Sequence, residues 1–144
     1  MEEEKIECTG KCYFVLLLAL FQFMECGILL IVMLKCKVQG FFAYVLLDLI
    51  LVMLCSIAIY FLLYWKNKKI VMSDNEIIYY PIIGKVTTYS WNDVKKIYYK
   101  SGLRGHSRLV IETDKKIYID CEMMKNCGET VKLIMKKGYL KTNI

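Results

Sequence analysis

Two stretches decide the fold of this chain: YFVLLLALFQFMECGILLIVML at residues 13–34 and FFAYVLLDLILVMLCSIAIYFLLYW at residues 41–65. The first has only Gln22 and Glu25 as strongly polar members, and the second only Asp48 and one serine. A bilayer core about 30 Å thick needs roughly 20 helical residues, so each stretch is long enough to cross it as a helix. The short linker between them allows only an antiparallel turn. We therefore predict a transmembrane helical hairpin.

The first stretch lacks the pattern of a cleaved signal peptide. Its flank is acidic, its apolar run is too long, and no small-residue cleavage pattern follows it. A buried hairpin in a soluble protein is also disfavoured, because nothing else in 144 residues would cover both helices on all sides. The ends of the two stretches carry aromatic residues, as in the interfacial belt of membrane proteins: Tyr13, Phe14, Phe41, Phe42, Tyr60, Phe61, Tyr64 and Trp65.

The lysines predict the direction of the hairpin. Positively charged residues near membrane helices favour the cytoplasmic side, whereas acidic residues contribute little. Only Lys35 and Lys37 lie in the connecting loop. The outer ends of the hairpin carry Lys5, Lys11, Lys66, Lys68 and Lys69. We therefore expect a multi-pass protein of the plasma membrane with both termini cytoplasmic: a tail at 1–12, the hairpin at 13–65 and a domain at 66–144.

Charge divides at the same boundary. Residues 1–65 hold four lysines against six acidic residues, while residues 66–144 hold sixteen basic residues against eight acidic ones. A basic domain beside a membrane is attracted to anionic lipid. The simpler alternative is a solvated surface that keeps the domain soluble.

The seven cysteines contain no CxxC pair, and their number is odd. This pattern favours neither a disulfide framework nor a zinc site. A reducing, cytosolic setting for the soluble part fits it best.

The hydrophobic period changes at Ile70 and predicts about six short strands followed by one helix. Asn126 and Glu129 have the spacing of a capping box, and Gly138 is placed to end the helix. The fold class is therefore a membrane helical hairpin plus an α+β or mainly β domain. The expected strands are 70–72, 76–81, 86–89, 94–100, 109–113 and 116–120.

The middle of this domain reads Tyr89-Ser90-Trp91-Asn92-Asp93-Val94-Lys95-Lys96-Ile97. With the order of elements around it, this stretch resembles the bacterial pleckstrin-homology-like domains, which often follow one or two membrane helices. The resemblance covers about residues 68–139. It implies a bent barrel or sandwich of six to seven strands with a C-terminal helix, in which Trp91 is a structural anchor.

Gln22, Glu25 and Asp48 are polar residues at membrane depth, where ionised carboxylates are costly and therefore mark functional candidates. In an antiparallel hairpin Glu25 and Asp48 are able to approach each other. One interpretation is that they are neutral and hydrogen-bond across helices or between copies of the chain. The alternative is an ion-linked or proton-linked role.

No catalytic constellation is apparent, since His106 is the only histidine. We expect no enzyme activity, no cofactor, no bound metal and no nucleic-acid partner. One basic cluster is a candidate contact for anionic lipid headgroups: Lys95, Lys96, Lys100, Arg104 and Arg108. The sequence thus predicts a membrane-anchored binding or scaffolding protein with an unknown protein partner or a homo-oligomeric state. The alternative is a small channel or transport component that uses Glu25 and Asp48.

Overall fold

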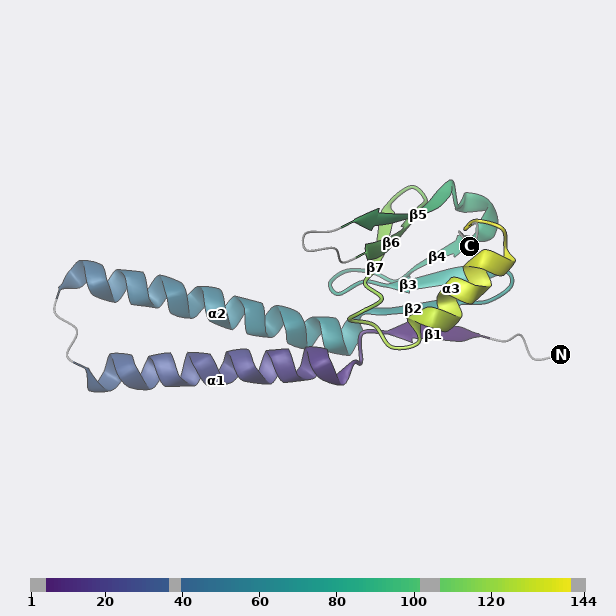
Figure 1. Cartoon of the computed structure of the whole chain (residues 1–144). Helices are drawn as coiled ribbons and strands as arrows, with labels where there is room; N and C mark the ends of the chain where they lie inside the picture. Colours follow the sequence, from purple (N-terminus) through teal and green to yellow (C-terminus); the bar gives the residue numbers. More distant parts are fainter. Residues whose placement is uncertain (1–4, 37–39, 102–106, 141–144) are drawn as a thin grey trace.

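The computed structural model describes residues 5–36, 40–101 and 107–140 (Figure 1). A short strand, a pair of long helices, six further strands and a final helix follow one another along the chain. The elements are β1 (Ile6–Thr9), α1 (Tyr13–Lys35), α2 (Phe41–Asn67), β2 (Lys69–Met72), β3 (Glu76–Tyr80), β4 (Thr87–Ser90), η1 (Trp91–Asp93), β5 (Lys96–Ser101), β6 (Ser107–Glu112), β7 (Lys116–Ile119) and α3 (Cys127–Lys136).

The helices α1 and α2 run antiparallel, side by side, and project away from the strands (Figure 1). Both are long and apolar enough to cross a membrane, at 23 and 27 residues. Only 17% and 6% of their most apolar windows are buried within the described structure, so these are not core helices of the β domain. The predicted hairpin of two long apolar helices is confirmed.

The strands form two antiparallel sheets, one with the order β1-β2-β3-β4 and the other with the order β5-β6-β7. All six predicted strands are present, within a few residues of their expected bounds. Strand β1 was not predicted and lies in the segment expected as a tail. Its residues pair with β2, with Cys8 opposite Ile70. The hairpin is therefore inserted between two neighbouring strands of one sheet.

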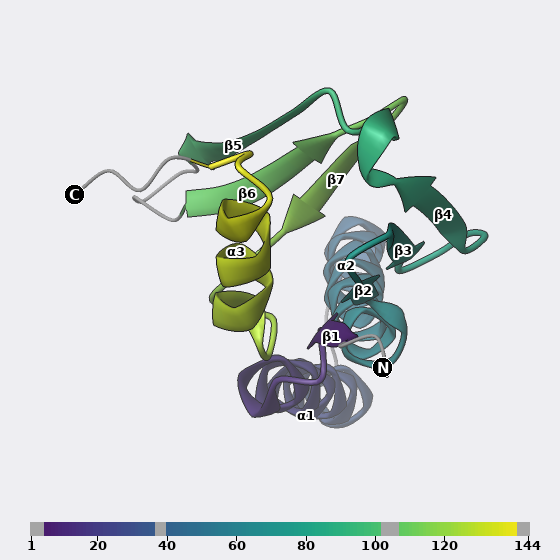
Figure 2. The same ribbon diagram turned by 90° about the vertical axis from the view of Figure 1, so that its right-hand side faces the viewer.

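Helix α3 covers the open side between the two sheets (Figure 2). The end of this helix was predicted correctly from sequence, whereas its N-terminal cap was not. The predicted capping box is wrong: Asn126 adopts a left-handed conformation with φ of 64°, and its side chain makes no cap. That side chain instead donates to the Glu7 carbonyl of β1. At the other end Gly138, with φ of 81°, donates to Met135, and Tyr139 donates to Ile134, which is the predicted glycine stop.

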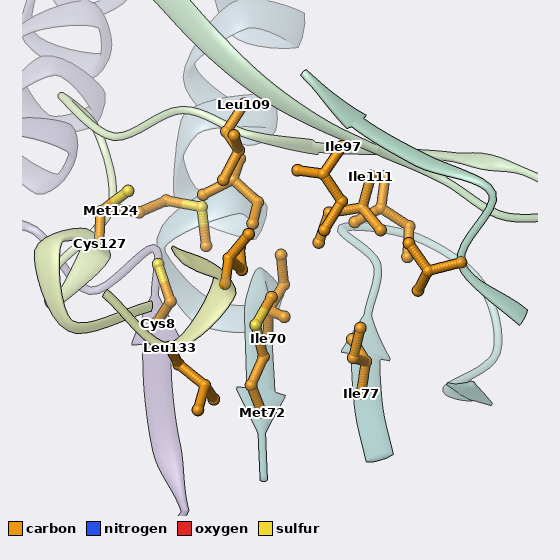
Figure 3. Packing of buried hydrophobic residues seen from close by; sticks show 14 of the residues in the cluster. Cys8, Ile70, Met72, Ile77, Ile97, Leu109, Ile111, Met124, Cys127 and Leu133 are labelled. Atoms are coloured by element: carbon orange, nitrogen blue, oxygen red, sulfur yellow. The ribbon is translucent and has the colours of Figure 1, made fainter. Parts of the chain in front are cut away.

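The core lies between the sheets and α3. Buried side chains from β1, β2, β3 and the second sheet converge there (Figure 3). Each fully buried Ile or Leu contributes about 1.5–3 kcal/mol. The fully buried members include Cys8, Ile70, Met72, Ile77, Leu109, Ile111, Ile117, Ile119 and Ile134.

Candidate functional site

A cleft of about 980 Å³ lies where the hairpin joins the domain. Its walls come from β1, the last turn of α2, the start of β2, the loop between β3 and β4, and the start of α3. We call it the junction cleft. Its lining residues are Glu7, Thr9, Lys11, Leu63, Lys66, Asn67, Lys68, Lys69, Tyr80, Pro81, Ile82, Ile83, Gly84, Val86, Lys125 and Asn126.

Five of the lining residues are lysines, and they differ in what their ammonium groups contact. Lys69 binds Glu7 at 2.7 Å and lies 5.5 Å from the ring of Tyr80. The side chains of Lys11, Lys66 and Lys125 are exposed. Within the described ranges no carboxylate pairs with any of these three. The cleft therefore presents three unneutralised cations from three separate segments.

Lys68 is buried, with 5% of its surface exposed. Its ammonium donates to the Tyr79 hydroxyl at 3.2 Å and lies 4.8 Å from the centre of that ring. Burial lowers the pKa of Lys68 by removing water from the charged form. This ammonium therefore makes its contacts inside the domain and adds little to the charge at the cleft surface.

The cleft also has apolar lining residues. They are Leu63 from α2 and Ile82, Ile83 and Val86 from the β3–β4 loop, and together they are called the apolar wall. The Asn67 side chain donates to the Ile82 carbonyl at 2.9 Å and so holds this loop against the end of α2. The cleft thus combines cations with an apolar wall, which suits an amphiphile whose head is anionic.

A second set of contacts fixes the orientation of the domain on α2. The Tyr64 hydroxyl donates to Asp120 Oδ2 at 3.3 Å, and Arg108 Nε binds Asp120 Oδ1 at 2.6 Å. Gly10 lies directly against the Tyr64 carbonyl, where a Cβ would be only 2.6 Å from the oxygen. These contacts, made by residues from both ends of the hairpin, give the cleft fixed walls.

Three residues of the basic cluster predicted from sequence share the outer face of the second sheet: Lys96 and Lys100 of β5, and Arg108 of β6. Lys96 and Lys100 are four residues apart in β5, about 13 Å along the strand, and so point to the same face. Lys95 is exposed just before that strand. Arg108 lies opposite Lys100 in the neighbouring strand, but its guanidinium is neutralised by Asp120. Arg104 and His106 lie outside the described residues.

The structure also separates the two carboxylates of the apolar helices. Cys26 and Cys55 are in contact between the helices, with their sulfurs 3.4 Å apart, and this contact sets the register of the hairpin. It places Asp48 level with Met33, eight residues or about 12 Å along the axis from Glu25. The expectation that the two acids approach each other is wrong for a single copy, because the register separates them.

Their immediate surroundings differ as well. Glu25 is half-buried and accepts a hydrogen bond from Gln22 of the same helix. Asp48 is exposed on α2. Neither observation brings the acids into a shared site within one hairpin.

Trp91 has the contacts of a structural residue. It is buried, and its indole nitrogen donates to the Ser73 carbonyl at 2.9 Å. Its ring stacks on Tyr139 with centroids 5.7 Å apart, and the Tyr139 hydroxyl donates to the Trp91 carbonyl. These contacts join η1 to the turn after β2 and to the end of α3.

The cysteine pattern favoured no disulfide framework, but the structure contains a disulfide. Cys121 and Cys127 form a disulfide across the connection from β7 to α3, with Cα atoms 5.2 Å apart. This pair was not predicted, because Cys121 and Cys127 are six residues apart and so form no CxxC pair. Among the described residues, no three His, Cys, Asp or Glu side chains are grouped to hold a metal ion.

Comparison with known proteins returned no matching family model, no matching curated protein and no matching solved structure. The geometry of the junction cleft is therefore the basis for a functional assignment. From sequence, Lys11 and Lys66 indicate only the orientation of the hairpin, and Lys125 is not predicted to belong to the same site. Lys11 and Lys66 had a signal in sequence, their position beside the ends of the apolar stretches, whereas Lys125 had none.

Proposed function

We propose that this chain is a membrane-anchored, non-enzymatic binding protein. In this proposal the hairpin spans the plasma membrane, both termini are cytoplasmic, and the junction cleft binds the headgroups of anionic phospholipids. One observation carries the proposal: exposed Lys11, Lys66 and Lys125 meet an apolar wall at the end of α2. The end of α2 is where an apolar helix would leave the hydrocarbon region.

The position of the cleft supports lipid over a soluble anion. Trp65, next to the cleft residue Lys66, is an aromatic residue of the kind found at the membrane–water interface. Each lysine near an anionic membrane surface contributes about 1 kcal/mol of attraction. Three such lysines beside apolar Leu63 suit a phosphate whose acyl chains stay in the bilayer.

We also propose a pleckstrin-homology-like fold for the domain. The support is architectural: antiparallel sheets of four and three strands and a C-terminal helix agree with what the sequence resemblance implies. The hairpin would then replace the turn between the first two strands. This arrangement would hold one end of the sheet at the membrane surface.

Lipid selectivity of the purified full chain tests the binding function. The protein is reconstituted in vesicles of equal phosphatidylglycerol and phosphatidylcholine, and its retained lipids are identified by native mass spectrometry. The test variant is the triple substitution of Lys11→Gln, Lys66→Gln and Lys125→Gln. The matched control removes the same charge from the sequence-predicted cluster, by Lys95→Gln, Lys96→Gln and Lys100→Gln.

The proposal predicts preferential retention of phosphatidylglycerol by the wild type and by the control, and loss of that preference in the cleft variant. Equal preference in the cleft variant and the wild type would contradict it. So would an equal loss in the two triple variants, because binding would then depend on overall charge. Complete displacement of the lipid by inorganic phosphate would identify the cleft as a site for free anions instead.

A further inference from the structure

The loop between β3 and β4 presents an apolar tip that the domain does not cover. It reads Pro81-Ile82-Ile83-Gly84-Lys85-Val86. Ile83 is 78% exposed and Val86 is 50% exposed. Single exposed apolar side chains are common on soluble proteins, so exposure alone does not assign a role to this loop. Its position relative to the hairpin does.

Contacts hold this loop beside the last turns of α2. The Asn67 side chain donates to the Ile82 carbonyl, and Ile82 and Ile83 line the same cleft as Leu63. Figure 1 shows the loop lying next to the end of α2 and pointing along it toward the hairpin. The apolar tip therefore lies at the level where α2 changes from apolar residues to Lys66 and Asn67.

The chemistry of the tip fits the boundary of a bilayer. Gly84 has φ of 122°, a conformation that favours glycine and turns the chain back after the two isoleucines. Lys85 follows at once and is exposed. A lysine can keep its ammonium among lipid phosphates while its stem and its apolar neighbours enter the acyl region.

We infer that the Pro81–Val86 loop inserts into the interfacial region of the same bilayer that holds the hairpin, with Ile83 among the acyl chains. The inference rests on the proposed function, because it requires the hairpin to span the membrane. The occupant of this surface is lipid and not a protein. The loop would form a third membrane contact beside the two helices and would close one side of the junction cleft with lipid.

Site-specific photocrosslinking tests this insertion in the full chain reconstituted in vesicles. p-Benzoylphenylalanine, which attacks nearby C–H bonds on illumination, replaces one residue at a time. Position 83 tests the loop. Position 49 is the positive control, since Leu49 is 62% exposed in the middle of α2. Position 92 is the negative control, since Asn92 is exposed in η1, at the end of the domain away from the hairpin (Figure 1).

The expected result is a mass shift of one lipid at positions 49 and 83, and none at position 92. Adducts at position 49 without adducts at position 83 would overturn the insertion and leave the membrane hairpin intact. Absence of adducts at position 49 would contradict the membrane hairpin itself, and the insertion with it. Equal adducts at positions 83 and 92 would also overturn the inference, because lipid would then reach any exposed surface.

Discussion

The hydroxyl of Tyr64, in the last turns of α2, donates to Asp120 at the end of β7 across 3.3 Å. Tyr64 is 2% exposed, so this bond is formed away from water. It joins a helix of the hairpin to the second sheet, while β1 and β2 join both helices to the first sheet. The domain is therefore held against the hairpin through both of its sheets.

Tyr64→Phe removes this hydrogen bond and leaves the ring in place. We expect a loss of about 1 kcal/mol in the free energy of unfolding, because Asp120 keeps its ion pair with Arg108. Denaturant unfolding in detergent, followed by tryptophan fluorescence, measures it. Tyr60→Phe is the control, since Tyr60 lies on the same helix and is 48% exposed. An equal effect of the two substitutions would show that the Tyr64–Asp120 bond contributes nothing specific.

Gly10 and Gly27 give a matched pair for the junction between β1 and the hairpin. A Cβ at Gly10 would lie 2.6 Å from the Tyr64 carbonyl oxygen, whereas a Cβ at Gly27 has nothing within 4 Å. Gly10→Ala is expected to destabilise the protein by about 1–3 kcal/mol, since backbone cannot yield easily. Gly27→Ala lies within a helix and should be neutral or stabilising by up to about 1 kcal/mol. A neutral Gly10→Ala would contradict the close approach of β1 and α2.

Cys8 predicts a pH dependence of stability. Burial raises the pKa of its thiol to about 11 from an ordinary value of 9.0. The folded state holds the thiol proton more tightly than the unfolded state does. The contribution of the buried Cys8 thiol to the free energy of unfolding is therefore fully present below pH 9 and is lost as the pH rises toward 11. The stability difference between the wild type and Cys8→Ala should therefore shrink over that interval.

Denaturant unfolding of both proteins from pH 7 to about pH 11 measures this difference. Subtracting the two free energies of unfolding cancels the effect of groups that titrate in both proteins. Burial of Lys68 acts in the opposite direction, because a lowered lysine pKa makes the folded state gain stability as pH rises. Lys68 is present in both proteins. A difference that stays constant with pH would show that Cys8 is accessible to water.

Much of the architecture was predictable because its signals are local. The two apolar stretches require helices in a bilayer, and alternating β-branched and aromatic residues marked six of the strands. Gly138 ended α3 as expected because only its own backbone conformation matters there. Strand β1 gave no such signal, since its partner strand lies 60 to 66 residues away, beyond the hairpin.

The site was less predictable, because its residues come from segments that only the fold brings together. Lys11, Lys66 and Lys125 are far apart in sequence, and Lys125 enters the cleft through the pairing of Thr9 with Lys125. The predicted basic cluster was local in sequence: Lys96 and Lys100 share one face of β5, and Arg108 in the neighbouring strand pairs with Asp120. Asn126 failed as a cap because a distant carbonyl, that of Glu7, takes its side chain.

We propose that the hairpin crosses the plasma membrane and holds the junction cleft on the cytoplasmic side. Cys36 is exposed at the end of α1 farthest from the domain (Figure 1), so a maleimide that cannot cross membranes tests it in intact cells that express the chain. We expect Cys36 to be labelled from outside without permeabilisation, and Cys36→Ser to abolish this labelling. Labelling of Cys36 only after permeabilisation would contradict it.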